Sequence, residues 1–236
     1  IHEGLQSTLL GLKGIPELAE TMQVKRDLDL LAYVMQHSFG LTNANFSLHF
    51  SCISSAESVK LINVAQKAGL PVTVDVAVHS LIFTEEALAD FDTLKKVNPP
   101  LRTEKDRLAL WKGLKEGIIS SVVSDHHPQE VEYKELEFDQ AAFGTIGLET
   151  LAIAFISEAK KQGLDKLDQY LSHNSAAFLG IQQPELKVGE WMKGMIIKNE
   201  SHVYESNSIF SKSKNSIFLG HSFSYKVAGV YHGSIQ

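Results

Sequence analysis

The sequence has little of several features that define whole classes of protein. Cys52 is the only cysteine among 236 residues, so no disulfide can form within the chain. No apolar run approaches the roughly 20 residues that a membrane-spanning helix needs. The formal net charge is −6, and no dense patch of lysine and arginine offers a nucleic-acid surface. We therefore expect a cytoplasmic, acidic protein that binds neither nucleic acid nor a membrane.

Strand and helix patterns alternate along most of the chain. Three short runs are apolar and rich in β-formers: 46–51, 72–77 and 118–124. Segments with apolar residues at helical spacing lie before, between and after them: 15–39, 55–69, 103–117 and 147–163. Thr103 is suited to cap its helix, because acidic residues follow it in the first turn. This alternation indicates an α/β fold with a parallel sheet.

The pattern changes near residue 181. Residues 165–180 predict two short helices that end at Gly180, and short alternating runs beyond them predict small strands: 195–198, 202–205 and 225–231. We place a domain boundary there, with an α/β domain over 1–180 and a small β-domain over 181–236. Three parallel strands cannot close a barrel. Since the sequence begins at Ile1 without methionine, we expect further strands to precede it.

Polar side chains follow the three predicted strands, at the ends where α/β proteins carry their functional groups. The strands lead in turn to Cys52, to His79, and to Asp125, His126 and His127. Asp125 could bind a divalent metal and take a proton from a metal-bound water; alternatively, it caps the following turn. Adjacent side chains on an extended segment point in opposite directions, so we expect at most one of the two histidines to face a site.

Cys52 and the segment 97–102 each have two interpretations. As a thiolate, Cys52 could bind zinc, whereas a lone cysteine is more often a small buried apolar residue. In the segment Val-Asn-Pro-Pro-Leu-Arg, Asn98 could donate to an oxyanion and Arg102 could grip a carboxylate bidentately. The alternative is a stiff turn whose arginine forms a structural ion pair. These residues by themselves leave the alternatives open.

Several segments, in order along nearly the whole chain, resemble one family. They are EGLQSTLLGLKGIPELAETMQVKRDLDLL, VNPPLRTEKDRLALWKGLKEG, SDHHP, KELEFDQAAFGTIGLET and FSKSKNSIFLG. The chain resembles the dihydroorotase family of the amidohydrolase superfamily. That resemblance implies a TIM-type (β/α)8 barrel, with the last three strands and helices present here, plus a small C-terminal β-domain. It also implies zinc-dependent, reversible cyclisation of carbamoyl-aspartate to dihydroorotate in pyrimidine biosynthesis.

The resemblance assigns roles to individual residues. Asp125 matches the family's metal-binding aspartate, which acts as general base, and Asn98 matches an asparagine that contacts the substrate. Ala142 and Gly144 lie in a loop, 142–147, that matches a segment whose backbone contacts the pyrimidine ring. The family's site holds two zinc ions.

Two departures from the family pattern are serious. Cys52 stands where the motif His-Val-Ser-Thr has a zinc-binding histidine, so Cys52 would join Asp125 as an unusual zinc ligand. Gln129 stands where Asp-His-Ala-Pro-His ends in a histidine that helps hold the substrate carboxylate, and an amide keeps one hydrogen bond there but no charge.

Two main hypotheses follow. The protein is an active dihydroorotase, or it is a non-catalytic homologue that serves as a structural partner of aspartate carbamoyltransferase. A hydantoinase-like hydrolase of other cyclic amides is a more remote third. We expect a homo-oligomer, and we expect no catalysis by this chain alone, because half of the expected metal ligands lie outside it.

Overall fold

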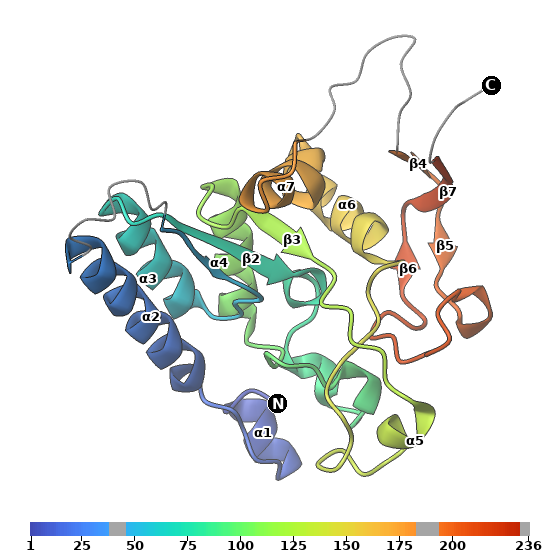
Figure 1. Ribbon diagram of the computed structural model, residues 1–236. Coiled ribbons are helices and arrows are strands. Elements are labelled where there is room, and N and C mark those ends of the chain that lie inside the picture. The colour runs from blue at the N-terminus through green and yellow to red at the C-terminus, as the bar shows by residue number, and fades with distance from the viewer. Residues whose placement is uncertain (38–45, 183–193, 232–236) are drawn as a thin grey trace, which may run out of the picture.

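The computed structural model describes residues 1–37, 46–182 and 194–231. A parallel three-stranded sheet lies at its centre, in the order β1-β2-β3 (Figure 1). The strands are β1 (Leu48–Phe50), β2 (Val72–Ala77) and β3 (Ser121–Val123). Leu48 pairs with Val72, and Asp75 pairs with Ser121. The three predicted strands and their parallel arrangement are confirmed, although β1 and β3 are shorter than the apolar runs around them.

Helices flank and connect these strands. They are α1 (Leu5–Leu10), α2 (Glu17–His37), α3 (Ala56–Lys67), α4 (Glu104–Lys115), α5 (Val131–Lys134), α6 (Leu151–Lys161) and α7 (Asn174–Phe178). A π-helical turn, Gln169–His173, precedes α7. The helices α2 and α3 lie side by side, and α4 lies next to α3 (Figure 1). No helix among the described residues is long and apolar enough to cross a membrane.

Capping side chains fix where α3 and α4 begin. Ser55 accepts a hydrogen bond from the amide of Ser58 at the start of α3, and Thr103 forms a capping box with Asp106 at the start of α4. Asp106 also accepts the backbone N–H of Ala56 at 2.9 Å. One buried carboxylate therefore joins the first turns of both helices.

The C-terminal segment forms two small antiparallel pairs. β4 (Gly194–Lys198) pairs with β7 (Lys226–Tyr231), and β5 (His202–Val203) pairs with β6 (Ser222–Phe223), a strand that the sequence pattern did not predict. Phe218 and Phe223 of this segment belong to the same apolar core as Val74 of β2 and Phe155 of α6. The core thus continues across the boundary expected near residue 181. Residues 183–193 lie outside the described residues, and the two-domain division stays a prediction.

Candidate active site

The carboxyl ends of the three strands bring Cys52, His79 and Asp125 together. The Cys52 thiol lies close enough to the Asp125 carboxylate for each to shift the pKa of the other, and His79 Nε2 lies 3.9 Å from Asp125 Oδ2. Cys52 and Asp125 both have positive φ angles, 58° and 46°. Residues other than glycine rarely adopt this conformation, and where they do they cluster at functional sites. The polar residues that the sequence placed at three separate strand ends thus form one cluster.

His79 is the most enclosed member of this cluster, with 1% of its surface exposed. Within the described part of the chain, neither of its ring nitrogens has a hydrogen-bond partner. Burial lowers the pKa of His79 to about 4, and the nearby charge of His127 acts in the same direction. The imidazole is therefore neutral at pH 7. A neutral imidazole with an unpaired nitrogen facing a carboxylate is suited to hold a metal ion together with that carboxylate.

Asp125 contacts a second imidazole on its solvent side. His127 Nδ1 lies 3.1 Å from Asp125 Oδ1, and 62% of the His127 side chain is exposed. Burial raises the pKa of Asp125, and the charge of His127 and the contact with the Cys52 thiol oppose that shift only in part. His126 is used differently, because its Nδ1 accepts the backbone N–H of Gly147 at 3.1 Å. Only one of the two adjacent histidines contacts Asp125, as the extended-chain argument predicted.

The Cys52 thiol holds its proton firmly. Burial raises the pKa of Cys52 to about 12, and the negative charges of Asp125 and Asp75 add to the effect. At neutral pH the thiol is thus protonated, and its sulfur accepts a hydrogen bond from Ser51 Oγ at 3.7 Å. Since a thiolate is the form that binds zinc, Cys52 would have to give up this proton to become a ligand.

A cavity of about 300 Å³ opens beside Cys52. Its lining includes Asn98 and Pro100 from the segment 97–102, and Glu20 from α2. The Asn98 residue is exposed, so its amide is accessible to a ligand in this cavity. Cys52 therefore lies between two features: the cavity that contains Asn98 and the cluster around Asp125.

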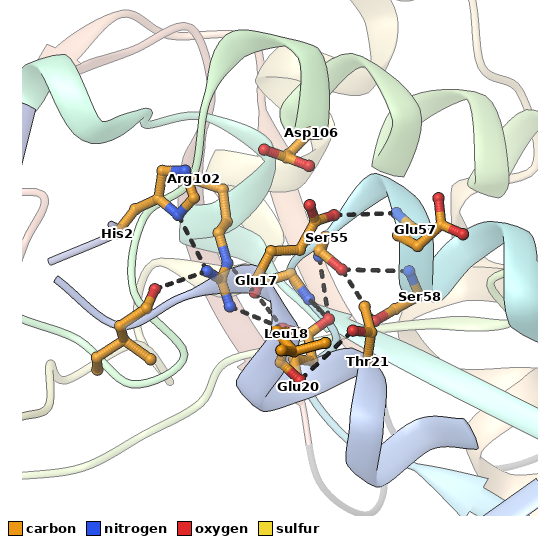
Figure 2. A network of polar contacts seen from close by, with 12 residues as sticks. His2, Glu17, Leu18, Glu20, Thr21, Ser55, Glu57, Ser58, Arg102 and Asp106 are labelled. Carbon is orange, nitrogen blue, oxygen red and sulfur yellow. Dashed lines mark hydrogen bonds and ion pairs between the residues drawn. The ribbon is translucent and has the colours of Figure 1, made fainter. Parts of the chain in front are cut away.

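Arg102 is buried and engaged within the protein, as Figure 2 shows. Its guanidinium donates to Ser54 Oγ at 2.9 Å and to the Ile15 carbonyl at 3.1 Å. It also contacts His2 Nδ1 at 3.0 Å and forms an ion pair with Glu20 at 3.5 Å. Of the two interpretations of Arg102, the structural ion pair is therefore the one that the structure supports.

Gln129, Ala142 and Gly144 lie together in the long segment between β3 and α6. Gln129 Nε2 donates to the carbonyl of Phe143 at 2.9 Å. The backbone N–H groups of Ala142 and Gly144 each donate to a protein carbonyl, also at 2.9 Å. These residues hold the segment in its conformation, and its carbonyl groups are engaged as well: Ala142 accepts from Lys134 Nζ and Gly144 from Asn215 Nδ2.

Asn215 supports this segment and was not singled out by the sequence pattern. It is 4% exposed, accepts the Gln129 N–H at 3.0 Å, and donates to the carbonyls of His127 and Gly144 at 3.0 and 3.2 Å. Its partners lie 71 to 88 residues away in the chain, so no local pattern could identify them.

Asp75, in the middle of β2, is the second functional residue that the pattern missed. It is buried at 5% exposure and accepts the backbone N–H of Cys52 at 2.6 Å. A signal for it was present in the sequence, because a carboxylate inside an apolar strand is costly unless it is paired.

Comparisons with known proteins bear on both the fold and the sequence. No family model matches the chain. Among solved structures, the L-hydantoinase (dihydropyrimidinase) from Arthrobacter aurescens is 24% identical with a TM-score of 0.77, over 88% of this chain and 46% of that one. The inactive dihydroorotase-like domain of a Chaetomium thermophilum CAD-like multifunctional protein is 20% identical with a TM-score of 0.59, over 85% of this chain and 52% of that one.

Curated relatives are closer in sequence. The dihydroorotase of Caldicellulosiruptor saccharolyticus is 41% identical, and that of Carboxydothermus hydrogenoformans is 39% identical; each match covers 100% of this chain and 54% of the relative. The dihydroorotase of Chlorobaculum tepidum is 38% identical over 99% of this chain and 55% of its own length. The chain thus spans about half the length of the curated relatives it matches.

The structure has the α/β fold of amidohydrolase enzymes. Within that class, the sequence relatives of the chain are dihydroorotases. The resemblance inferred from the segment 97–102 and from the strand end at Asp125 is therefore confirmed.

Proposed function

We propose that this chain forms the C-terminal part of a dihydroorotase, which interconverts carbamoyl-aspartate and dihydroorotate by closing and opening a cyclic amide. The observation that carries the proposal is the identity of 36–41% to dihydroorotases, over 93–100% of this chain in the two cited matches. In this proposal the three strands β1 to β3 are the last three of a (β/α)8 barrel, and 181–236 is a small β-domain beside it.

Each site residue then has a task. Asp125 is the general base, and its raised pKa suits a carboxylate that must accept and release a proton. Asn98 contacts the substrate from the cavity beside Cys52. Gln129 holds the substrate carboxylate through its amide, which would exchange its hydrogen bond to the Phe143 carbonyl for one to the substrate, and the backbone at Ala142 and Gly144 borders the ring.

Zinc is the proposed cofactor, and the residues present fit it in part. His79 and Asp125 face each other across 3.9 Å, and both nitrogens of His79 lack another partner among the described residues. Those residues contain no group of three or more His, Cys, Asp or Glu side chains that could hold a metal. As they lie here, Asp125, Cys52 and His79 do not form such a group, so Asp125 with Cys52 or with His79 would supply only part of the ligand set. When bound, zinc would polarise the amide carbonyl and make a bound water more acidic.

The second candidate is a non-catalytic homologue that associates with aspartate carbamoyltransferase. It is favoured by Cys52 and Gln129, which replace two functional histidines of the family pattern. The names of the curated relatives favour the enzyme instead. A homo-oligomer in the cytoplasm is proposed in either case.

The test measures zinc content and dihydroorotate hydrolysis in the protein that contains this chain. We expect near-stoichiometric zinc, and we expect Asp125→Asn to reduce kcat/KM by about 100-fold or more, as loss of a general base does. Asp90→Asn, which changes an exposed carboxylate, is the matched control and should leave the rate unchanged.

Absence of both metal and turnover, with metal binding gained when Cys52→His and Gln129→His are combined, would contradict the proposal. That result would support the non-catalytic partner.

A further inference from the structure

We propose that Asp75 is a positioning residue, which holds Cys52 at the end of β1 and thereby fixes the arrangement of Cys52 against Asp125. The inference rests on the proposed function only in so far as Cys52 and Asp125 belong to the active site. The contacts that carry it involve no metal and no substrate.

Asp75 forms hydrogen bonds with the turn that follows β1. Its Oδ1 accepts the Cys52 N–H at 2.6 Å, and both carboxylate oxygens lie 3.2 Å from Ser51 Oγ. Its own carbonyl accepts the N–H of Ile53 at 3.2 Å. The turn contains Cys52 at φ 58°, a conformation that a side-chain-bearing residue keeps only when its surroundings determine it. Asp75, on the adjacent strand, holds Cys52 in this conformation through these hydrogen bonds.

His49 in turn orients Asp75. His49 Nε2 lies 2.9 Å from Asp75 Oδ2, and its Nδ1 lies 2.8 Å from the hydroxyl of Thr73, its register partner on β2. The His49 ring also packs against Phe178, with ring centroids 4.2 Å apart and ring planes tilted by 30°. Because a carboxylate only accepts hydrogen bonds, Nε2 donates to Asp75, and Nδ1 is hydrogen-bonded to the Thr73 hydroxyl. The contacts with Thr73 and Phe178 therefore hold the imidazole that orients Asp75.

Cys52 consequently lies between two carboxylates. Its backbone N–H donates to Asp75, and its thiol is near enough to Asp125 for the two groups to shift each other's pKa. A shift of the Cys52 backbone would move the thiol relative to Asp125, so the carboxylate of Asp75 acts on the site through Cys52. Asp75 is therefore a positioning residue and not a catalytic one.

The experiment uses Cys52 as its own probe, since the chain has no other cysteine. The rate of alkylation by iodoacetamide is measured on the folded chain, together with its thermal stability. We expect Asp75→Ala to raise the rate about tenfold or more, as expected when a charge-assisted hydrogen bond is lost. Asp75→Asn removes the same negative charge, which alone favours the thiolate, but its amide oxygen can still accept the Cys52 N–H, so its rate should rise less than that of Asp75→Ala. His49→Phe keeps a ring against Phe178, removes both polar contacts, and should raise the rate by a smaller factor than Asp75→Ala.

Val74→Ala is the matched control, because it weakens the fully buried core of the same strand without touching Asp75. Equal alkylation of Val74→Ala and Asp75→Ala at equal stability would overturn the proposal, since the rate would then report only destabilisation. Wild-type rates in Asp75→Ala and His49→Phe would also overturn it. If Asp75→Ala does not fold, His49→Phe decides, and an unchanged rate there overturns the inference. None of these readouts requires turnover, so failure of the proposed function would appear separately, in the hydrolysis assay.

Discussion

At the scale of single residues, Asp125 lies between two imidazoles in opposite environments. His79 is enclosed and neutral, and His127 is largely exposed to solvent. The same carboxylate therefore has a fixed partner on its buried side and a solvent-exposed partner on the other. This arrangement suits a base that must exchange its proton with water, and it makes the buried imidazole sensitive to acid.

The stability of the metal-free protein should fall in acid because of His79. Its folded pKa of about 4 lies below its ordinary value of 6.5, so the unfolded chain binds the proton first as the pH falls. The contribution of neutral His79 to the free energy of unfolding is complete above pH 6.5. It is lost progressively toward pH 4, by up to roughly 3 kcal/mol. Denaturant unfolding of chelator-treated protein should show this slope, and His79→Gln should flatten it.

The matched control is His173→Gln, which alters an exposed histidine and should keep the wild-type slope. Parallel pH profiles for wild type and His79→Gln would contradict the assignment of this slope to His79.

Position 144 requires glycine because of both its backbone conformation and the atoms around it. Its φ is 121°, and an added Cβ would lie 2.7 Å from the Cβ of His127 and 3.0 Å from the His127 carbonyl oxygen. We expect Gly144→Ala to lower the free energy of unfolding by about 2–4 kcal/mol, from backbone strain plus overpacking. Gly163→Ala shares the positive φ but meets no atom within 4 Å, and should cost about 1 kcal/mol. Equal losses in the two variants, measured by urea unfolding, would exclude the predicted clash.

At the scale of secondary-structure elements, Asp106 couples two helices. It accepts hydrogen bonds from Thr103 in its own capping box and from the N–H of Ala56 at the start of α3. Asp106→Ala should destabilise the protein by about 2–3 kcal/mol, because it removes a cap and leaves the buried amide of Ala56 unpaired. Glu104→Ala, two residues away on an exposed site, should change stability by less than about 1 kcal/mol. A loss at Asp106 no larger than that at Glu104 would show that the two helix starts are independent.

At the scale of the whole molecule, the sequence predicted the regular elements well, because they depend on local patterns. The capping residues Ser55 and Thr103 and the apolar strand 72–77 carry their own signals. What could not be predicted depends on distant partners. The role of Arg102 depends on its ion pair with Glu20, and the role of Asn215 depends on partners as far as 88 positions away in the sequence. The two-residue strand β6 is too short to show the alternation of apolar and polar residues that indicates a strand.

The isolated 236-residue chain should not hydrolyse dihydroorotate, even with added zinc. The reason is that its described residues hold no group of three or more metal-binding side chains. Absorbance of the cyclic amide over time is the measurement. Turnover that disappears with a chelator and with Asp125→Asn would contradict this expectation and would place a complete site within the chain.

The hydrogen bonds of Asn215 also bear on the order in which the protein folds. They close loops of 71 to 88 residues, whereas His49 and Thr73, which pair across β1 and β2, are separated by only 24. Closing the longer loops carries a larger entropic penalty, so the Asn215 contacts should form after the transition state for folding. Asn215→Ala should therefore accelerate unfolding and leave the refolding rate nearly unchanged, while Asn207→Ala, at an exposed asparagine, should change neither. Stopped-flow refolding slowed by Asn215→Ala would reverse this order. On this view, the segment around Gln129 and Gly144 is the last part of the site to assemble and the first to open.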